Sequence, residues 1–179
     1  GTGMLYVANA NSDSVSVISA ASASVIQTVS TGFRPVALAV NPRTNRIYTA
    51  NQASDTVTVI NGDDLTTSTV SVGSAPSAIA VDSRANRIFV ANKGAGTVTA
   101  INGVNNATQS VTIGAQPIDL AVNQATGHMY AATANGVFVI NGVDLSVATI
   151  AGATQPAALA ADPLRNKIVA ANPATGDLT

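Results

Sequence analysis

Cysteine and tryptophan are both absent from this chain of 179 residues. Without cysteine the chain has no disulfide framework, no thiolate nucleophile and no cysteine metal site. Charged residues make up only 9% of the sequence, and all of the acidic ones are Asp. This scarcity of Glu and Lys argues against long helices with charged faces. The formal net charge of −1 gives no overall electrostatic reason to expect a polyanion as partner.

Long apolar runs are also missing, so the sequence predicts no segment that spans a bilayer. The apolar residues, 46% of the chain, are nevertheless abundant, although aromatics contribute only 3%. Val, Ala, Ile and Leu supply the apolar surface, and Ser, Thr and Asn supply the polarity. β-Branched residues suit pleated strands, while Asn and Gly suit turns. The composition therefore favours an all-β protein.

A repeat of about 41 residues organises the chain. The segments RIYTANQASDTVTVING (46–62) and RIFVANKGAGTVTAING (87–103) are nearly identical. Related segments begin near residues 4, 128 and 167, at steps of 42, 41, 41 and 39 residues. Propeller blades of four strands have this period, and the alternating pattern of TVTVI (56–60) is typical of strands rather than helices.

Each repeat is predicted to be a four-stranded antiparallel meander, a blade. In the second copy, strand A is 35–41, strand B is 46–51, strand C is 56–61 and strand D is 67–72. The A–B turns end with Asn or Gly at positions 45, 86, 127 and 166, where a left-handed residue closes the turn. A Gly and then a Pro separate each strand D from the next strand A, and Pro is tolerated at the first residue of a strand.

The strand B segments YVAN (6–9), YTAN (48–51) and FVAN (89–92) carry a family resemblance. With the TVTVING-like strand and the Gly-x-x-Pro linker that follow, they resemble the YVTN-type β-propeller repeat over essentially the whole chain. The fourth copy departs from this pattern with YAAT (130–133). The resemblance implies an extracytoplasmic protein: periplasmic, secreted or part of a cell-surface layer. The YVTN-type family is related to lactonase-like propellers, and some of its members bind single-stranded DNA.

The predicted fold is one β-propeller segment, 1–179, that forms part of a larger ring of about seven blades. Its pieces are 1–34 (partial), 35–75, 76–116, 117–155 and 156–179 (partial). Open blade edges of this kind favour more blades or assembly with another subunit. The alternative is a closed four-blade ring, in which 156–162 pairs with 5–9.

Two titratable residues stand out as candidates for a site. Asp119 lies in strand A where the other copies have Ala37, Ala78 and Ala158, so it is expected near the propeller axis. There its carboxylate faces either a water-filled channel or a buried partner, and Asp119 is a candidate ligand-facing residue. His128 is the only histidine, and it occupies the position of Arg46 and Arg87 at the start of strand B. Without another His, Cys or Glu, a zinc site is not expected.

Most basic residues are predicted to share one face. Because strands A and C run opposite to B and D, the A–B and C–D turns lie on the same face, here called face 1. The B–C turns and D–A linkers form face 2. Six of the eight basic residues fall on or beside A–B turns: Arg43, Arg46, Arg84, Arg87, Arg165 and Lys167. Arg46 and Arg87 are the candidate ligand-facing residues in this set, together with His128 in the equivalent position of the fourth copy. The simpler interpretation is a series of exposed ion pairs.

The repeated strand-end residues Asn9, Asn51, Asn92 and Asn172 are interpreted as structural, because Asn satisfies backbone groups in a following turn. No catalytic, cofactor-binding or metal-binding residue is predicted. The sequence favours a non-enzymatic extracytoplasmic scaffold that binds a protein, a glycan or a neighbouring subunit. The first alternative is part of a lactonase-like enzyme whose catalytic residues lie mostly outside 1–179. Binding of single-stranded nucleic acid is ranked last, because it needs exposed aromatic side chains beside a basic groove. The aromatic residues that recur in strand B of the repeat are instead core-type residues: Tyr6, Tyr48, Phe89 and Tyr130.

Overall fold

The chain folds into five antiparallel β-sheets and, among the described residues, no helix. The computed structural model describes residues 3–153, 155–173 and 175–178. The partial sheets at the two ends are β1 Met4–Asn9, β2 Ser14–Ser19 and β3 Ser24–Ser30 (sheet 1), and β16 Ala158–Asp162, β17 Lys167–Asn172 and β18 Asp177–Leu178 (sheet 5). The complete sheets are β4 Pro35–Asn41, β5 Arg46–Asn51, β6 Thr56–Asn61 and β7 Thr67–Ser71 (sheet 2); β8 Pro76–Asp82, β9 Arg87–Asn92, β10 Thr97–Asn102 and β11 Thr108–Thr112 (sheet 3); and β12 Pro117–Asn123, β13 His128–Thr133, β14 Gly136–Asn141 and β15 Val147–Ile150 (sheet 4).

The predicted strands A to D are the successive strands of sheets 2, 3 and 4. Strands A, B and C of sheet 2 have the predicted bounds, whereas β7 is one residue shorter than predicted. The reason is that the Val72 N–H leaves the strand ladder and donates to the Asp55 carbonyl at 3.0 Å. The turn prediction is confirmed: Asn45, Asn86 and Asn166 have φ values of 49°, 50° and 52°, and Gly127 has a φ of 73°.

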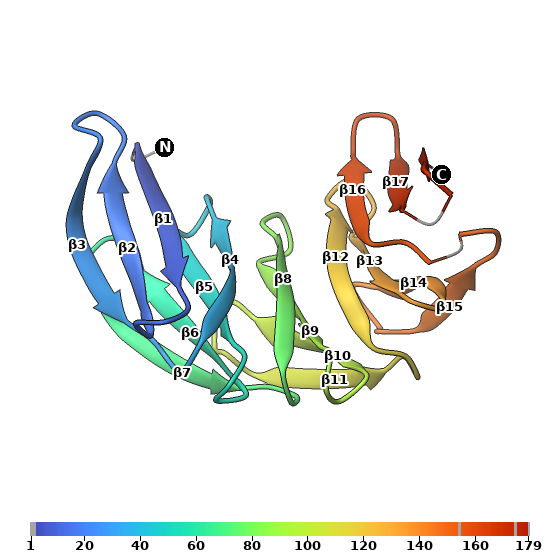
Figure 1. Cartoon of the computed structure of the whole chain (residues 1–179), viewed down its shortest axis with the longest axis horizontal. Coiled ribbons are helices and arrows are strands. Elements are labelled where there is room, and N and C mark those ends of the chain that lie inside the picture. The colour runs from blue at the N-terminus through green and yellow to red at the C-terminus, as the bar shows by residue number, and fades with distance from the viewer. Residues whose placement is uncertain (1–2, 154, 174, 179) are drawn as a thin grey trace.

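The sheets stack side by side into an open arc, with the A strands of sheets 2 to 5 (β4, β8, β12 and β16) on the concave side (Figure 1). Strands β4, β8, β12 and β16 contact one another in that order, and β3, β7, β11 and β15 lie on the convex side. This confirms the predicted all-β architecture and the innermost position of strand A. Inner strands that turn about a common axis are typical of a β-propeller.

Apolar side chains between neighbouring sheets hold the arc together. Tyr48 from sheet 2 is fully buried against Ile88 and Ile101 of sheet 3. Phe89 of sheet 3 is in turn fully buried in a cluster that includes Met129 of sheet 4. Since each sheet buries its faces only against its neighbours, the fold is stabilised by stacking, as in other repeat proteins.

The alternative of a closed four-blade ring is wrong for this structure. Strand β1 pairs with β2, and β16 pairs with β17; the described residues show no ladder between β1 and β16. Sheet 5 instead adds a short third strand, β18, which the sequence did not predict. The part of the chain that the structure describes also contains no helix long and apolar enough to cross a membrane.

Candidate functional site

Asp119 joins two sheets through its carboxylate. Its side chain lies on β12, where the register shifts between Pro117 and Asp119. The Leu159 N–H on β16 donates to Asp119 Oδ2 at 2.7 Å, and the Leu120 N–H donates to Oδ1 at 2.9 Å. The sequence left two environments open for this carboxylate, a water-filled channel or a protein partner. In the structure both of its oxygens have backbone N–H partners. Oδ2 thus connects sheet 4 to sheet 5, while Oδ1 bonds within β12 itself.

The strand-end Asn residues are held inside their own sheets. Asn51 and Asn92 are fully buried. Asn51 Nδ2 donates to the hydroxyls of Thr56 and Thr58 at 3.1 and 2.9 Å, and Asn92 Nδ2 repeats these bonds with Thr97 and Thr99. These contacts agree with the structural interpretation, although the partners are hydroxyl groups of strand C rather than turn backbone. In the fourth copy, Thr133 instead donates from Oγ1 to the Gly136 carbonyl at 3.0 Å.

Arg46 and Arg87 make equivalent contacts across neighbouring sheet joints. Arg46 Nη1 donates to the Gly103 carbonyl at 2.7 Å, and Arg87 Nη1 donates to the Val143 carbonyl at 3.3 Å. Both acceptors lie in the C–D turn of the next sheet. The two arginines thus connect sheet 2 to sheet 3 and sheet 3 to sheet 4, while their charges stay without a carboxylate partner among the described ion pairs.

His128 lies at the same position in sheet 4, beside a hollow of about 170 Å³ lined partly by Val139, Asn141 and Ser146. Bonds from the Ser146 N–H and hydroxyl lower the pKa of the nearby Asp144, and the charge of His128 contributes least. Equivalent hollows beside Arg87 and Arg46 measure about 190 and 160 Å³. No three His, Cys, Asp or Glu side chains of the described ranges gather where they could hold a metal ion.

A row of polar contacts that the sequence analysis missed lies at the face 1 ends of the inner strands. Asn41 Nδ2 donates to Asn86 Oδ1 at 2.8 Å, and Asn123 Nδ2 donates to Asn166 Oδ1 at 2.8 Å. These bonds connect sheet 2 to sheet 3 and sheet 4 to sheet 5. At the joint between sheets 3 and 4, the buried Asp82 takes the place of Asn41, and Gly127 takes the place of Asn86. That joint therefore lacks a side-chain amide partner for the carboxylate, whose Oδ1 accepts the Arg84 and Ala85 N–H groups within its own turn.

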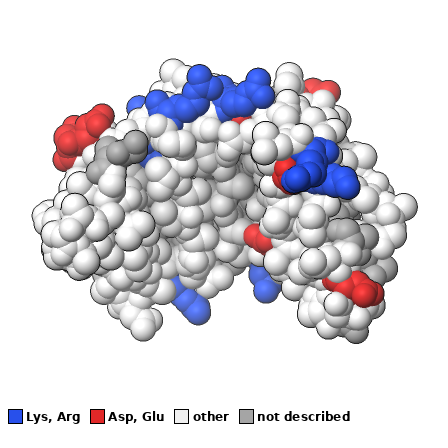
Figure 2. Space-filling model, turned by 90° about the horizontal axis from the view of Figure 1, so that it is seen from above, with Lys and Arg blue, Asp and Glu red and all other residues white. Residues whose placement is uncertain are grey.

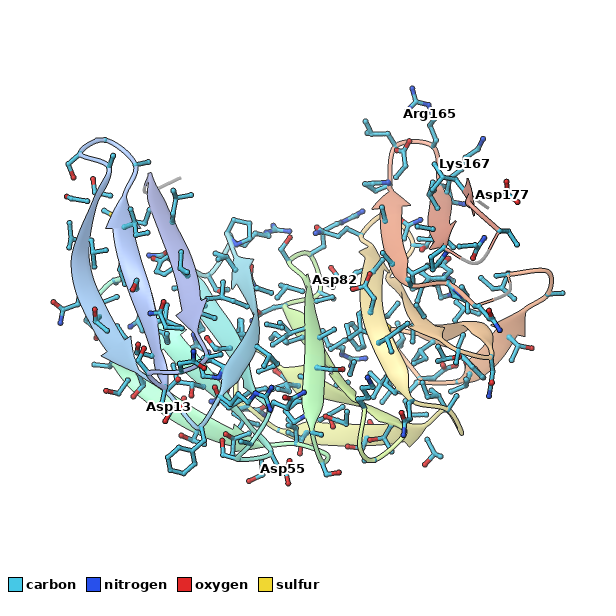
Figure 3. The ribbon with its side chains drawn as sticks, in the orientation of Figure 1. Asp13, Asp55, Asp82, Arg165, Lys167 and Asp177 are labelled. Atoms are coloured by element: carbon cyan, nitrogen blue, oxygen red, sulfur yellow. The ribbon has the colours of Figure 1, made fainter. Side chains whose placement is uncertain are left out.

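On face 2, Asp13 and Asp55 hold the D–A linkers. Asp13 Oδ1 accepts the Arg34 N–H at 2.7 Å, and Asp55 Oδ1 accepts the Ala75 N–H at 2.8 Å. Both linker residues are left-handed, with φ values of 55° and 49°. Figure 3 shows Asp13 and Asp55 at the lower ends of their strands, away from Arg165 at the upper end. The carboxylates of Asp13 and Asp55 therefore stabilise the linkers that connect one sheet to the next.

Basic side chains gather along one rim of the molecule (Figure 2). Within the described ranges, one ion pair forms, between Arg165 Nη1 and Asp162 Oδ2 at 2.9 Å. Arg43 and Arg84 are exposed on the A–B turns of sheets 2 and 3, and Arg84 Nη1 donates to the Gln124 carbonyl at 3.0 Å. The expected series of ion pairs on face 1 is thus absent from the described part of sheets 2 and 3, and guanidinium groups there contact carbonyls instead.

Comparison with known proteins identifies the fold. No family model matches the sequence, and no curated protein matches it. Among solved structures, a chain of the hydrazine synthase of Kuenenia stuttgartiensis is similar over 94% of this chain, with a TM-score of 0.81 and 20% sequence identity. This chain spans about half of that one, 52% of its length. At this identity the similarity shows the fold alone, and it agrees with a partial β-propeller.

Proposed function

We propose that this chain is part of a rigid β-propeller scaffold that binds a partner through its turns and carries out no chemistry of its own. The observation that most supports this proposal is the use of its polar groups. Asp119, Asn51, Asn92 and Asp13 all bond to groups that join strands or sheets. A general acid or base needs a titratable group within reach of a substrate proton, and these groups are already committed to the fold.

The proposal includes membership of the YVTN-type repeat family and an extracytoplasmic location, in the periplasm, outside the cell or in a surface layer. Its support is the strand B pattern YVAN, YTAN and FVAN together with the four-stranded sheets that this pattern forms. A protein, a glycan or a neighbouring subunit is the proposed partner class. Open sheet edges at β1 and β18 offer main-chain groups for assembly with further strands.

Two assays on the purified chain test this function. The first offers a panel of aliphatic and aromatic lactones, and we expect no hydrolysis above the rate in buffer. Hydrolysis that disappears in an Asp119→Ala variant that remains folded would overturn the scaffold proposal in favour of the lactonase-like alternative. The second assay is a peptide and glycan array, on which we expect saturable binding. A folded chain that binds nothing on either array would also contradict the proposal.

A further inference from the structure

Four arginines form a row on face 1 of sheets 2 and 3. Arg43 and Arg84 occupy the same position in successive A–B turns, and Arg46 and Arg87 begin the following strands. None of the four takes part in the ion pair that the described residues form. Three of them donate to backbone carbonyls, which leaves their charge uncompensated by a carboxylate. A planar guanidinium offers several donors, so each can still bind an added carboxylate.

Two exposed valines lie directly beside this row. Val104 and Val143 hold the same position in the C–D turns of sheets 3 and 4, and their side chains are 77% and 83% exposed. Arg87 donates to the carbonyl of Val143 itself, and Arg46 donates to the carbonyl of Gly103, next to Val104. These bonds hold the guanidinium groups of Arg46 and Arg87 against the turns that carry the exposed valines. In sheet 2 the same turn position is Asp63, so a polar residue is compatible with this turn.

We propose that Arg43, Arg46, Arg84, Arg87, Val104 and Val143 form a basic–apolar surface that binds an acidic protein segment carrying apolar side chains between its carboxylates. The inference rests on the proposed binding function and names its partner. Carboxylates bind guanidinium groups with charge-assisted hydrogen bonds, and apolar side chains of the partner cover the exposed valines. Sites that combine charge complementarity with a small apolar contact are typical of peptide recognition.

The surface fits nucleic acid less well. Single-stranded nucleic acids bind to grooves that combine positive charge with exposed aromatic rings. The exposed aromatic residue of the described chain is Phe33, which is 64% exposed and lies in the D–A linker on face 2. Tyr48 and Phe89 are fully buried between sheets.

The test is fluorescence anisotropy of the whole chain with a labelled peptide of about sixteen residues that repeats Glu-Leu-Glu-Gly. The reference peptide has Lys in place of each Glu. We expect micromolar binding of the acidic peptide, on the order of 10–100 µM, weakened at least about fivefold when salt rises from about 0.05 to 0.5 M. The double variant Arg43→Glu/Arg84→Glu should weaken binding about tenfold or more, because it replaces attraction by repulsion.

Two further variants separate this surface from general charge effects. Arg34→Glu/Lys93→Glu makes the same change in net charge on face 2 and should leave binding within about twofold of the unmodified chain. Val104→Ser/Val143→Ser removes the apolar side chains without changing the net charge and should weaken binding about threefold or more without unfolding, since both valines are exposed. All variants are first compared by circular dichroism and melting temperature.

Equal losses in the face 1 and face 2 charge variants would overturn this surface. Equal binding of the Lys peptide, or no binding of the acidic peptide, would overturn the partner class. Tighter binding of oligodeoxythymidine or polygalacturonate than of the acidic peptide would assign the surface to another polymer. The scaffold proposal itself fails only if the array assay finds no ligand or if lactone hydrolysis depends on Asp119, so the two failures are distinguishable.

Discussion

The carboxylate of Asp119 on β12 accepts the backbone N–H of Leu159 on β16 at 2.7 Å, across the joint between sheets 4 and 5. The equivalent position is Ala37 in sheet 2 and Ala78 in sheet 3. The residue that departs most clearly from the repeat is thus an acceptor for the next sheet. The Asp119 carboxylate therefore bonds to the backbones of two strands, at a position that the sequence suggested as ligand-facing.

This contact predicts the effect of mutating Asp119. Asp119→Ala removes the acceptor for two N–H groups, so it should lower the free energy of unfolding by about 1–3 kcal/mol. Asp119→Asn keeps an acceptor oxygen and should cost less than Asp119→Ala. Urea denaturation gives both values, with Asp177→Ala as the control because Asp177 is exposed on β18. A cost for Asp119→Ala no larger than that of the control would show that the Leu159 contact does not stabilise the fold.

The joint between sheets 3 and 4 offers a stabilising substitution. Gly127 is left-handed, with a φ of +73°, and a Cβ placed there would lie 3.9 Å from Asp82 Oδ2. Since Asn adopts this turn position in three other sheets, Gly127→Asn should fit and donate to the buried carboxylate. We expect a gain of about 0.5–1.5 kcal/mol in the free energy of unfolding.

The control for that substitution is Gly114→Asn. Gly114 is also left-handed, with a φ of +69°, but a Cβ there meets no atom within 4 Å. Both changes reduce the freedom of the unfolded chain, and only Gly127→Asn adds a contact with Asp82. Thermal unfolding should therefore rank Gly127→Asn above Gly114→Asn. Equal effects would mean that the side chain does not reach the carboxylate.

The buried Tyr48 predicts a dependence of stability on alkaline pH. Burial raises the pKa of Tyr48, and the charge of Arg46 partly opposes the rise. The Arg46 side chain also lies close enough to the hydroxyl to lower this pKa, although the two form no hydrogen bond of ordinary length within the described residues. A raised pKa in the folded state contributes stability that is complete below about pH 10 and is lost as pH rises through the folded pKa.

Tyr48→Phe should therefore flatten the decline in stability above about pH 10. At neutral pH it should leave stability unchanged or raise it by up to about 1 kcal/mol, since it removes a buried unpaired hydroxyl. Urea denaturation of both proteins between about pH 7 and 11 measures the two effects. A variant that loses several kcal/mol at neutral pH would reveal a bonded hydroxyl and contradict this account.

The Asn–Thr contacts inside each sheet predict a large cost for a small change. Asn92→Ala removes the shared donor to the hydroxyls of Thr97 and Thr99. Asn92 and Thr99 are fully buried, although the Thr99 hydroxyl keeps its contact with Ser110. The free energy of unfolding should fall by about 1–3 kcal/mol. The exposed Asn11, in the turn between β1 and β2, serves as the control, and Asn11→Ala should change stability by less than about 0.5 kcal/mol. An equally small effect of Asn92→Ala would mean that these bonds do not explain why Asn recurs at the end of strand B.

Most of the fold could be predicted because the repeat specifies local structure several times over. The alternation in TVTVI and the turn residues Asn45 and Asn86 gave correct strands and turns within each sheet. The partners across sheets could not be predicted in the same way. The bond from Asn41 to Asn86 and that from Arg46 to Gly103 join residues 45 and 57 positions apart. Their geometry depends on how one sheet stacks on the next, which a repeat period does not define.

Hydrogen–deuterium exchange of the chain with and without the Glu-Leu-Glu-Gly peptide locates the binding surface. We propose that the peptide binds to face 1 of sheets 2 to 4. This proposal predicts slower exchange at 41–46, 82–87, 102–107 and 141–146, with unchanged exchange in the face 2 linkers at 31–34 and 73–75. Slower exchange confined to the face 2 linkers, or to the concave strands β4, β8 and β12, would contradict it.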